Sequence, residues 1–376
     1  MSKTAPAASP ARATPPDPRA PGPLRMLSGD RPTGRLHLGH YAGSLANRVR
    51  LHRSYQSFFI IADLHMLTTK NTRADIAATA GLARDMVLDS LAAGLDPQHS
   101  VFYLQSAIPE VAEVSLLLQS LITVPRLERV PSLKEMARDA GADEMAYALL
   151  GYPVLQAADI LGIGADVVPV GRDNAPHVEI AREVARRFNH LYGPTLTVPE
   201  LIPGGTPSLV GTDGQGKMSK SAGNVIYLSD PPEQVRRKVA RMYADPGRVR
   251  ADVPGTVQGN PVFVYHDEFN DDRAEVAGLK QRYRAGAVGD AEVKERLAAA
   301  INRFLDPMRE RRARFEASSG LAEELIVTGT EQARRQVQQT VAGMRRAMGF
   351  TAVFSQLRGS RPSAPGAPAT GGADGI

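Results

Sequence analysis

The chain has 376 residues, 43% of them hydrophobic and 23% charged, with a formal net charge of +5 at pH 7. It contains no cysteine, which excludes disulfides, thiol nucleophiles and cysteine-held zinc or iron–sulfur centres and fits a reducing cytoplasm. No stretch of about 18 apolar residues occurs, so no membrane span is expected. Most of the net charge lies in the two ends of the chain, so nucleic-acid binding has to be inferred from local clusters.

The two ends of the chain have the composition of disordered tails. Residues 1–23 consist mainly of Ala, Pro, Ser, Thr, Gly and Arg, and residues 357–376 are similarly poor in large apolar side chains. Such segments bury too little apolar surface to become ordered. The first tail also lacks the continuous apolar stretch of a secretory signal.

Between the tails, short apolar runs alternate with helical patterns. The runs cover 24–27, 57–62, 100–104 and 166–170, and helical patterns follow at about 38–52, 73–93, 110–122 and 172–190. Apolar strands joined by helices predict an α/β fold with a doubly wound parallel sheet, a Rossmann-like nucleotide-binding domain. Its ligand is expected beyond the carboxyl ends of the strands.

The strand patterns stop near residue 230. Helices are expected at 231–245, 272–285, 290–317 and 330–348, with Gly and Pro breaks between them. The sequence therefore predicts a first domain over 24–230 and a smaller C-terminal helical domain over 231–356.

Residues 28–40 (SGDRPTGRLHLGH) follow the first predicted strand and open the first helix. Gly29 and Gly34 permit a turn and a close backbone approach, and Gly39 lets a flat base lie against the backbone. His37 and His40 are three positions apart and share one side of the first helical turn. Helix N-termini attract phosphate, and imidazoles there can donate to its oxygens. A glycine-rich turn with two surface histidines would give the same pattern.

Residues 211–221 (GTDGQGKMSKS) nearly match a phosphate-binding loop. Met218 replaces the hydroxyl that binds Mg²⁺ in such loops, and neither a strong strand precedes the motif nor a long helix follows it, which disfavours that reading. What remains is a glycine-rich loop with the ammonium groups of Lys217 and Lys220. Such a loop suits a pyrophosphate whose charge grows in the transition state, although a solvated basic loop would have the same composition.

The pair HLGH at 37–40 and KMSKS at 217–221, about 180 residues apart, resembles the two signatures of class I aminoacyl-tRNA synthetases. Four further segments are similar to bacterial tryptophanyl-tRNA synthetases: 62–69 (ADLHMLTT), 151–161 (GYPVLQAADIL), 168–177 (VPVGRDNAPH) and 338–350 (QQTVAGMRRAMGF). The resemblance covers about 24 to 350. It implies a ligase that activates L-tryptophan with ATP and transfers it to tRNA(Trp), with 24–230 as the catalytic domain and 231–356 as the tRNA-binding domain.

The resemblance also implies the roles of single residues. Asp159 is expected to accept the indole N–H, which an otherwise apolar slot with one carboxylate would favour. The other expected tryptophan contacts are Gly29, His65, Tyr152, Gln156, Val168, Val170 and Asn174. The expected ATP site is formed by Arg31, Pro32, Thr33, Gly39, His40, Gly171, Arg172, Asp173, Leu209, Lys217, Met218, Ser219, Lys220 and Ser221. The expected catalytic residues, which meet charge developing on the phosphates, are His37, His40, Lys217 and Lys220.

Two alternatives remain open at this point. Many tryptophanyl enzymes have Met where Gln156 stands and Gln where Asn174 stands, and Tyr152 with Gln156 also resembles the pocket of tyrosyl-tRNA synthetases. The run at 169–177 and the Ala-Met-Gly ending at 347–349 favour tryptophan. The second alternative is a synthetase-like module that no longer charges tRNA, against which the intact signatures argue. Taken singly, His65, Asp159 and His177 could also be hydrogen-bonded interior residues.

The expected partners follow from the same resemblance. Mg²⁺ would enter with ATP, and no tightly bound structural metal is expected. A homodimer in the cytoplasm is implied by resemblance alone. Candidate tRNA contacts are the arginine-rich clusters 236–238 with Arg241, 309–314 and 345–346, which could equally be solvated helix faces.

Overall fold

The computed structural model describes residues 22–131, 133, 146–171, 174–204, 209–220, 222–248 and 250–359. Three residues expected in the ATP site, Arg172, Asp173 and Ser221, lie outside the described residues. So do most of the two tails for which disorder was predicted.

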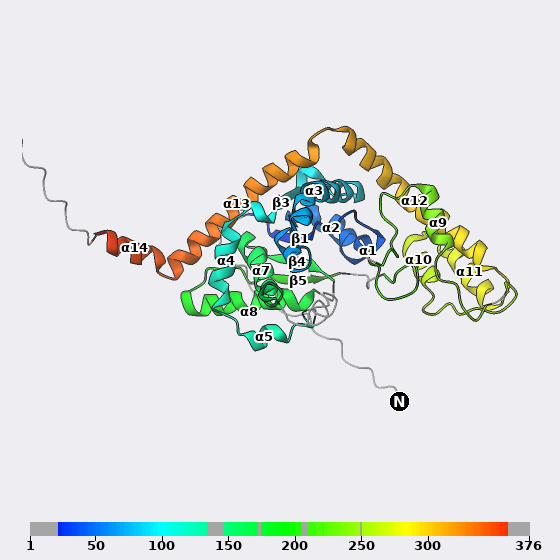
Figure 1. The fold of residues 1–376 in the computed structure, drawn as a ribbon, viewed down its shortest axis with the longest axis horizontal. Coiled ribbons are helices and arrows are strands. Elements are labelled where there is room, and N and C mark those ends of the chain that lie inside the picture. Colours follow the sequence, from blue (N-terminus) through cyan, green and yellow to red (C-terminus); the bar gives the residue numbers. More distant parts are fainter. Residues whose placement is uncertain are drawn as a thin grey trace, which may run out of the picture.

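A five-stranded parallel sheet with the order β3-β2-β1-β4-β5 forms the centre of the molecule (Figure 1). The strand order reverses between β1 and β4, where Met26 pairs with Val167, and in such sheets the ligand crevice lies at this point. The predicted Rossmann-like sheet is confirmed, and β5 is an additional edge strand. The strands are β1 (Arg25–Asp30), β2 (Gln56–Ile61), β3 (Ser100–Leu104), β4 (Val167–Val170) and β5 (Glu200–Pro203).

Helices cover both faces of the sheet. The predicted helix at 73–93 is α3, where Thr72 and Asp75 form a capping box. The one predicted at 38–52 is divided by a π-helical turn, Tyr41–Leu45. Helix α7 was not predicted because it is apolar almost throughout and contains Pro153, which conceals the helical period. The helices of this part are α1 (Leu38–His40), α2 (Ala46–Leu51), α3 (Arg73–Ala93), α4 (Glu110–Gln119), α5 (Val124–Glu128), α7 (Tyr147–Ile163) and α8 (Ala175–Tyr192).

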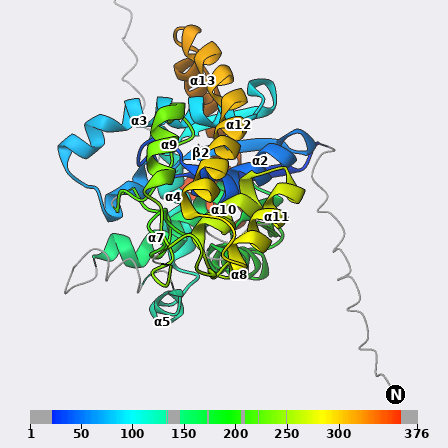
Figure 2. The ribbon, with the colours of Figure 1, turned by 90° about the vertical axis from the view of Figure 1, so that its right-hand side faces the viewer.

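After β5 the described chain continues as helices and loops. Helices α9, α10 and α11 gather around the first half of α12, to one side of the sheet (Figures 1 and 2). Helix α12 leads back to α3, and α13 crosses β3, α4 and α7. The bounds are α9 (Pro232–Ala240), α10 (Pro261–Phe269), α11 (Arg273–Arg284), α12 (Asp290–Ala317), α13 (Leu321–Ala347) and α14 (Phe350–Gly359).

Helix α13 touches β3 directly at a glycine. A Cβ atom on Gly329 would lie 2.0 Å from the carbonyl oxygen of Phe102, so only glycine allows this approach. The hydroxyl of the next residue, Thr330, accepts the Leu104 N–H at 3.0 Å. The C-terminal part of the chain thus completes the packing of the sheet edge.

Alternate residues of each strand enter two separate cores. Met26, Phe59 and Phe102 point into the core shared with α2, α3 and α12. Leu27 and Phe58 point into the core shared with α4, α7, α8 and α13. This burial on both faces explains the continuous apolar runs of the strands. In the part of the chain that the structure describes, no helix combines the length and apolar character needed to cross a membrane.

Candidate active site

The HLGH turn stands at the carboxyl end of β1 and begins α1. The backbone N–H of His37 donates to Nδ1 of His40 at 3.1 Å, and the two ring centroids are 3.7 Å apart. Because Nδ1 of His40 accepts, the proton of a neutral His40 ring lies on Nε2. Burial lowers the pKa of His37 to about 2 and that of His40 to about 4. Both rings are therefore neutral near pH 7 and act as hydrogen-bonding groups rather than cations.

A buried ion pair holds the end of β1 beneath this turn. Arg48 of α2 pairs with Asp30, with Nη1 and Oδ2 2.5 Å apart, and its Nη2 donates to the Gly29 carbonyl at 3.0 Å. Burial alone would raise the pKa of Asp30, but the charge and hydrogen bonds of Arg48 lower it to about 2. This pair was not predicted from the sequence: Asp30 lies in the 28–40 segment, but its partner Arg48 lies outside that segment and in no other motif.

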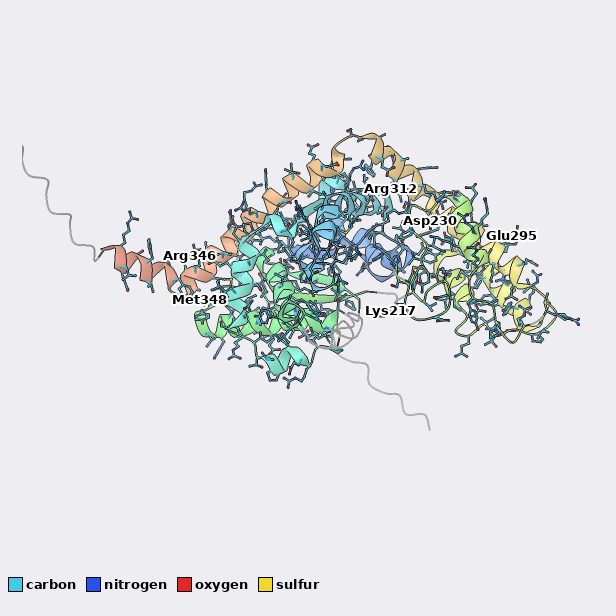
Figure 3. All side chains as sticks on the ribbon, viewed as in Figure 1. Lys217, Asp230, Glu295, Arg312, Arg346 and Met348 are labelled. Atoms are coloured by element: carbon cyan, nitrogen blue, oxygen red, sulfur yellow. The ribbon has the colours of Figure 1, made fainter. Side chains whose placement is uncertain are left out.

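The KMSKS segment begins in a short hairpin. Met218 N–H donates to the Leu209 carbonyl and Gly211 N–H to the Gly216 carbonyl, both at 3.1 Å. Gly216 has a φ of 61°, a left-handed conformation that suits glycine. Leu209, in the first arm of the hairpin, is buried, whereas Lys217, in the second arm, is exposed. Lys217 lies on the side of the sheet that faces the helical part (Figure 3).

The two signature segments are joined by main-chain and side-chain bonds. Leu38 N–H donates to the Ile226 carbonyl at 2.9 Å, and Leu228 N–H donates to the Leu36 carbonyl at 3.0 Å. Gly39 N–H lies 3.3 Å from the sulfur of Met218, as donor to it. Segments about 180 residues apart in sequence therefore form a single site.

Lys220 links the same segments through its side chain. Its Nζ donates to the Gly34 carbonyl at 2.9 Å and to the Thr33 hydroxyl at 3.3 Å. Burial lowers the pKa of Lys220 to about 8, so the ammonium form dominates near pH 7. Ser219 is held by its N–H, which donates to Asn224 at 2.7 Å. The two lysines thus differ: one is exposed, and the other is partly buried against the HLGH loop.

The other expected ATP-site residues lie around this junction. Arg31 is exposed, and Pro32 is buried. Gly171 follows β4, and Gly204 packs between it and the π-helical turn after HLGH: a Cβ on Gly204 would lie 3.2 Å from the Gly43 carbonyl and 3.7 Å from Gly171 Cα. The end of β4 is therefore brought next to the helix that HLGH opens.

A second cluster surrounds Asp159 on α7. Nε2 of His65 donates to Oδ2 at 3.0 Å, and the Gln105 amide donates to both carboxylate oxygens at 2.9 Å. Asp159 is 4% exposed, and burial raises its pKa while the two donors oppose that rise. A carboxylate has about four acceptor positions, of which these bonds use three. One position remains for a further N–H donor.

Gln105 is a site residue that the sequence analysis missed. It lies directly after β3, is completely buried, and its Oε1 accepts the Leu64 N–H at 3.1 Å. Its place at the carboxyl end of a predicted strand was the available signal, because ligands bind at that edge of a parallel sheet.

Aromatic side chains surround the Asp159 cluster. The His65 and Tyr152 rings meet edge to face at 6.3 Å between centroids, and the Tyr152 hydroxyl is 3.0 Å from Nε2 of His177. The buried Tyr103 hydroxyl has no hydrogen-bond partner among the described residues, and burial raises its pKa well above the usual 10. Such a wall suits a large, flat aromatic substrate.

The remaining expected tryptophan contacts are dispersed. Gly29 has a packing reason of its own, because a Cβ there would lie 2.1 Å from the Ile60 carbonyl on β2. Val168 is buried in β4, Val170 and Gln156 are half-buried, and Asn174 is exposed at the start of α8. Within the described chain, Asn174 makes no hydrogen bond to the Asp159 cluster; its backbone N–H donates to the Gly171 carbonyl at 3.1 Å.

Comparison with known proteins decides the family. The model of class I tRNA synthetases for tryptophan and tyrosine matches residues 19–306. The tryptophan–tRNA ligase of Treponema pallidum is 56% identical over 329 residues, which cover 88% of this chain and 98% of that protein. The chain belongs to the tryptophan–tRNA ligase family.

Other members of the family agree with this assignment. The tryptophan–tRNA ligase of Borreliella burgdorferi is 48% identical over 335 residues, which cover 89% of this chain and 95% of that protein. The tryptophanyl-tRNA synthetase of Campylobacter jejuni, solved with ADP and tryptophan, has a TM-score of 0.73 at 30% identity, covering 87% of this chain and all of that one. The resemblance and fold class predicted from the sequence are confirmed, and tyrosine is not favoured.

Because this family acts on tRNA, the arginine clusters are candidate RNA contacts. In the structure, some of these arginines bind other parts of the chain and others are exposed. In the 309–314 cluster, Arg309 Nε donates to the Asp230 carbonyl at 2.9 Å and Arg311 Nε to the Ala92 carbonyl at 2.7 Å. Arg312 pairs with Asp85 at 3.0 Å. These three arginines hold α12 in place, and RNA binding by this cluster stays a prediction. The exposed arginines include Arg236, Arg237, Arg241 and Arg346.

Proposed function

We propose that this chain activates L-tryptophan with ATP, giving tryptophanyl-adenylate and pyrophosphate, and then transfers the tryptophanyl group to tRNA(Trp). The observation that carries the proposal is the junction of the HLGH and KMSKS segments at the sheet edge that also holds the Asp159 cluster. Nucleotide chemistry and amino acid selection thereby meet at one edge.

In the first step, the tryptophan carboxylate attacks the α-phosphorus of ATP, and the bond to the bridging oxygen of pyrophosphate breaks. No covalent enzyme intermediate is needed. His37 and His40, both neutral near pH 7, offer ring N–H groups to phosphate oxygens. Lys217 and Lys220 place positive charge beside the leaving pyrophosphate. The chain contributes positioning and electrostatic stabilisation of the transition state.

The ATP site comprises residues of both segments and of the β4 end. Those within the described chain are Arg31, Pro32, Thr33, Gly39, Gly171, Leu209, Met218 and Ser219. Mg²⁺ enters with ATP, as the phosphates' counter-ion. Within the described ranges, no group of three or more His, Cys, Asp and Glu side chains could hold a metal ion.

The tryptophan side chain occupies the pocket around Asp159. The remaining acceptor position of this carboxylate takes the indole N–H, while His65 and Gln105 fix the carboxylate. Phenylalanine has no such donor and would leave the acceptor unpaired, which costs binding free energy. Gly29, Tyr152, Gln156, Val168, Val170 and Asn174 complete the proposed surroundings of the substrate.

The second step uses the tRNA bound along the helical part. The terminal ribose hydroxyl attacks the acyl carbon of the adenylate, and AMP leaves. Residues 24–230 form the proposed catalytic unit and 231–356 the proposed tRNA-binding unit, with Arg236, Arg237, Arg241 and Arg346 as candidate phosphate contacts. A homodimer acting in the cytoplasm completes the proposal.

The test is amino-acid-dependent exchange of pyrophosphate into ATP, measured with each of the twenty amino acids and no tRNA. Exchange with tryptophan alone is the expected result. Exchange with tyrosine would move the substrate assignment to Gln156, and no exchange from folded protein would favour the non-catalytic module. Charging of tRNA(Trp) with tryptophan then tests the second step.

A further inference from the structure

Asp89 on α3 is a completely buried carboxylate that has no part in the reaction just described. Its Oδ2 accepts the backbone N–H of Leu36 at 2.7 Å. Leu36 immediately precedes His37, and its carbonyl accepts the Leu228 N–H at 3.0 Å. The carboxylate therefore holds the residue at which the HLGH turn begins and at which it meets the chain after KMSKS.

Arg312 of α12 compensates the charge of Asp89. Its guanidinium forms ion pairs with Asp89, with Asp85 at 3.0 Å and with Glu316 at 2.9 Å, and its side chain is 11% exposed. Burial raises the pKa of Asp89, and the positive charge of Arg312 opposes that rise. A buried carboxylate without such a partner would be strongly disfavoured in its ionised form.

The same face of α12 also holds the other side of the junction. Arg309, one turn before Arg312, donates from Nε to the Asp230 carbonyl at 2.9 Å. The buried Asp230 side chain accepts the Tyr227 N–H at 2.9 Å. The backbone of Tyr227 forms an isolated antiparallel β-bridge with His37. One helix of the C-terminal part thus contacts the supports of both signature segments.

We propose that Asp89 and Arg312 are positioning residues for tryptophan activation: they fix Leu36 so that the His37–His40 turn stays aligned with the KMSKS segment. The inference rests on the proposed function. Displacement of a catalytic group by about 1 Å can reduce the rate on the order of a hundredfold, so a single support of this turn can matter to the chemistry. Neither residue touches a substrate in this proposal.

Two substitutions of Asp89 separate positioning from folding. Asp89→Asn keeps an oxygen that can accept the Leu36 N–H, whereas Asp89→Leu removes the acceptor at similar volume. In tryptophan-dependent exchange, Asp89→Leu should raise KM for ATP and lower kcat, on the order of tenfold to a hundredfold in kcat/KM. KM for tryptophan should stay near the wild-type value, since the Asp159 cluster is untouched. Asp89→Asn should retain most of the activity.

The matched control is Arg248→Met in the helical part. The Arg248 side chain is buried, donates to the Val253 carbonyl at 2.8 Å and pairs with Asp290 at 3.2 Å. Among the described residues, none of its hydrogen bonds or ion pairs reaches the signature segments. It should lose thermal stability as the Asp89 variants do, with unchanged kinetic constants for the folded enzyme. If Asp89→Leu fails to fold, the double variant Asp89→Asn/Arg312→Met replaces it, and should exceed Arg312→Met in kcat because no buried charge is left unpaired.

A readout without substrates distinguishes this proposal from the function on which it rests. Hydrogen exchange of the amides at 36–40 should accelerate in Asp89→Leu and not in Arg248→Met. Unchanged exchange there, or equal losses of kcat in Asp89→Asn and Asp89→Leu, would overturn the positioning role. Absence of tryptophan-dependent activity in the wild-type enzyme, with the amide effect present, would instead overturn the proposed function.

Discussion

The two halves of the site are held together in different ways. Around Asp159, buried side chains bind one another, so the acceptor for the substrate is fixed before the substrate arrives. At the HLGH and KMSKS junction, main-chain bonds join distant segments, and the lysines lie at the rim, one partly buried and one exposed. Selection of the amino acid thus depends on a rigid pocket, and activation depends on cations placed where a bound nucleotide can meet them.

If the two halves of the site differ in this way, the largest loss of activity is expected on substitution of Lys217. Lys217→Ala should lower kcat of tryptophan-dependent exchange by about a hundredfold to a thousandfold, because positive charge is lost where charge develops on the phosphates. KM for tryptophan should be unchanged. Steady-state exchange kinetics give both constants. Lys280→Ala, which removes a lysine paired with Asp267 in the helical part, is the matched control and should resemble the wild type.

The pocket should respond to a different change. Asp159→Asn weakens the acceptor for the indole N–H, so KM for tryptophan should rise by about 10- to 100-fold. Discrimination against phenylalanine should fall with it, while KM for ATP stays constant. The measurement is exchange with each amino acid over a range of concentrations. Intact discrimination in this variant would remove Asp159 from the recognition of the indole.

ATP activation at the HLGH and KMSKS junction should also depend on pH, for a reason that does not involve the Asp159 pocket. Since the pKa of Lys220 is lowered to about 8, a rise in pH above that value removes its proton and its positive charge. The kcat/KM for ATP should therefore fall by about tenfold per pH unit above pH 8. His37 and His40 stay neutral from about pH 5 upward, so they do not contribute to the change in kcat/KM above pH 8. Lys220→Arg should move the fall to higher pH; an unchanged profile would exclude Lys220 as its source.

The last prediction concerns the free energy of unfolding and the Asp30–Arg48 ion pair beneath the HLGH turn. The pKa of Asp30 is lowered from 3.8 to about 2, so its ion pair with Arg48 stabilises the folded state above pH 3.8 and loses that contribution as the pH falls toward 2. The contribution is about 2 kcal/mol. In urea unfolding, the difference in free energy between wild type and Asp30→Asn should shrink over this range. A difference that does not vary with pH would contradict the lowered pKa.

How far the sequence could predict the structure depended on the element. Helix α3 has a capping box at Thr72 and a clear end at Gly94, and α12 has polar breaks on either side, so their bounds were predicted well. Strand β5 escaped because four residues ending in Pro203 give a weak pattern at a sheet edge. The apolar α7 escaped because it lacks a polar face.

The site residues also differed in whether they could be predicted from the sequence. The HLGH and KMSKS residues could be named from the sequence because their types and spacing form a motif. Arg48 and Asp89 could not, since their contacts with Asp30 and with Leu36 arise only in the fold. For Gln105 the sequence offered only its place after a strand, and its contacts with Asp159 and Leu64 likewise arise only in the fold. A glutamine after a strand or an aspartate within a helix has many ordinary explanations, and the contact alone distinguishes them.

Calorimetric titration of tryptophan into the Lys217→Ala and Asp159→Asn variants, without ATP, tests the division of the site most directly. Lys217→Ala should bind tryptophan with the wild-type dissociation constant, and Asp159→Asn should bind it about 10- to 100-fold more weakly. Equal weakening in both variants, or none in Asp159→Asn, would contradict the separation of amino acid selection from ATP chemistry.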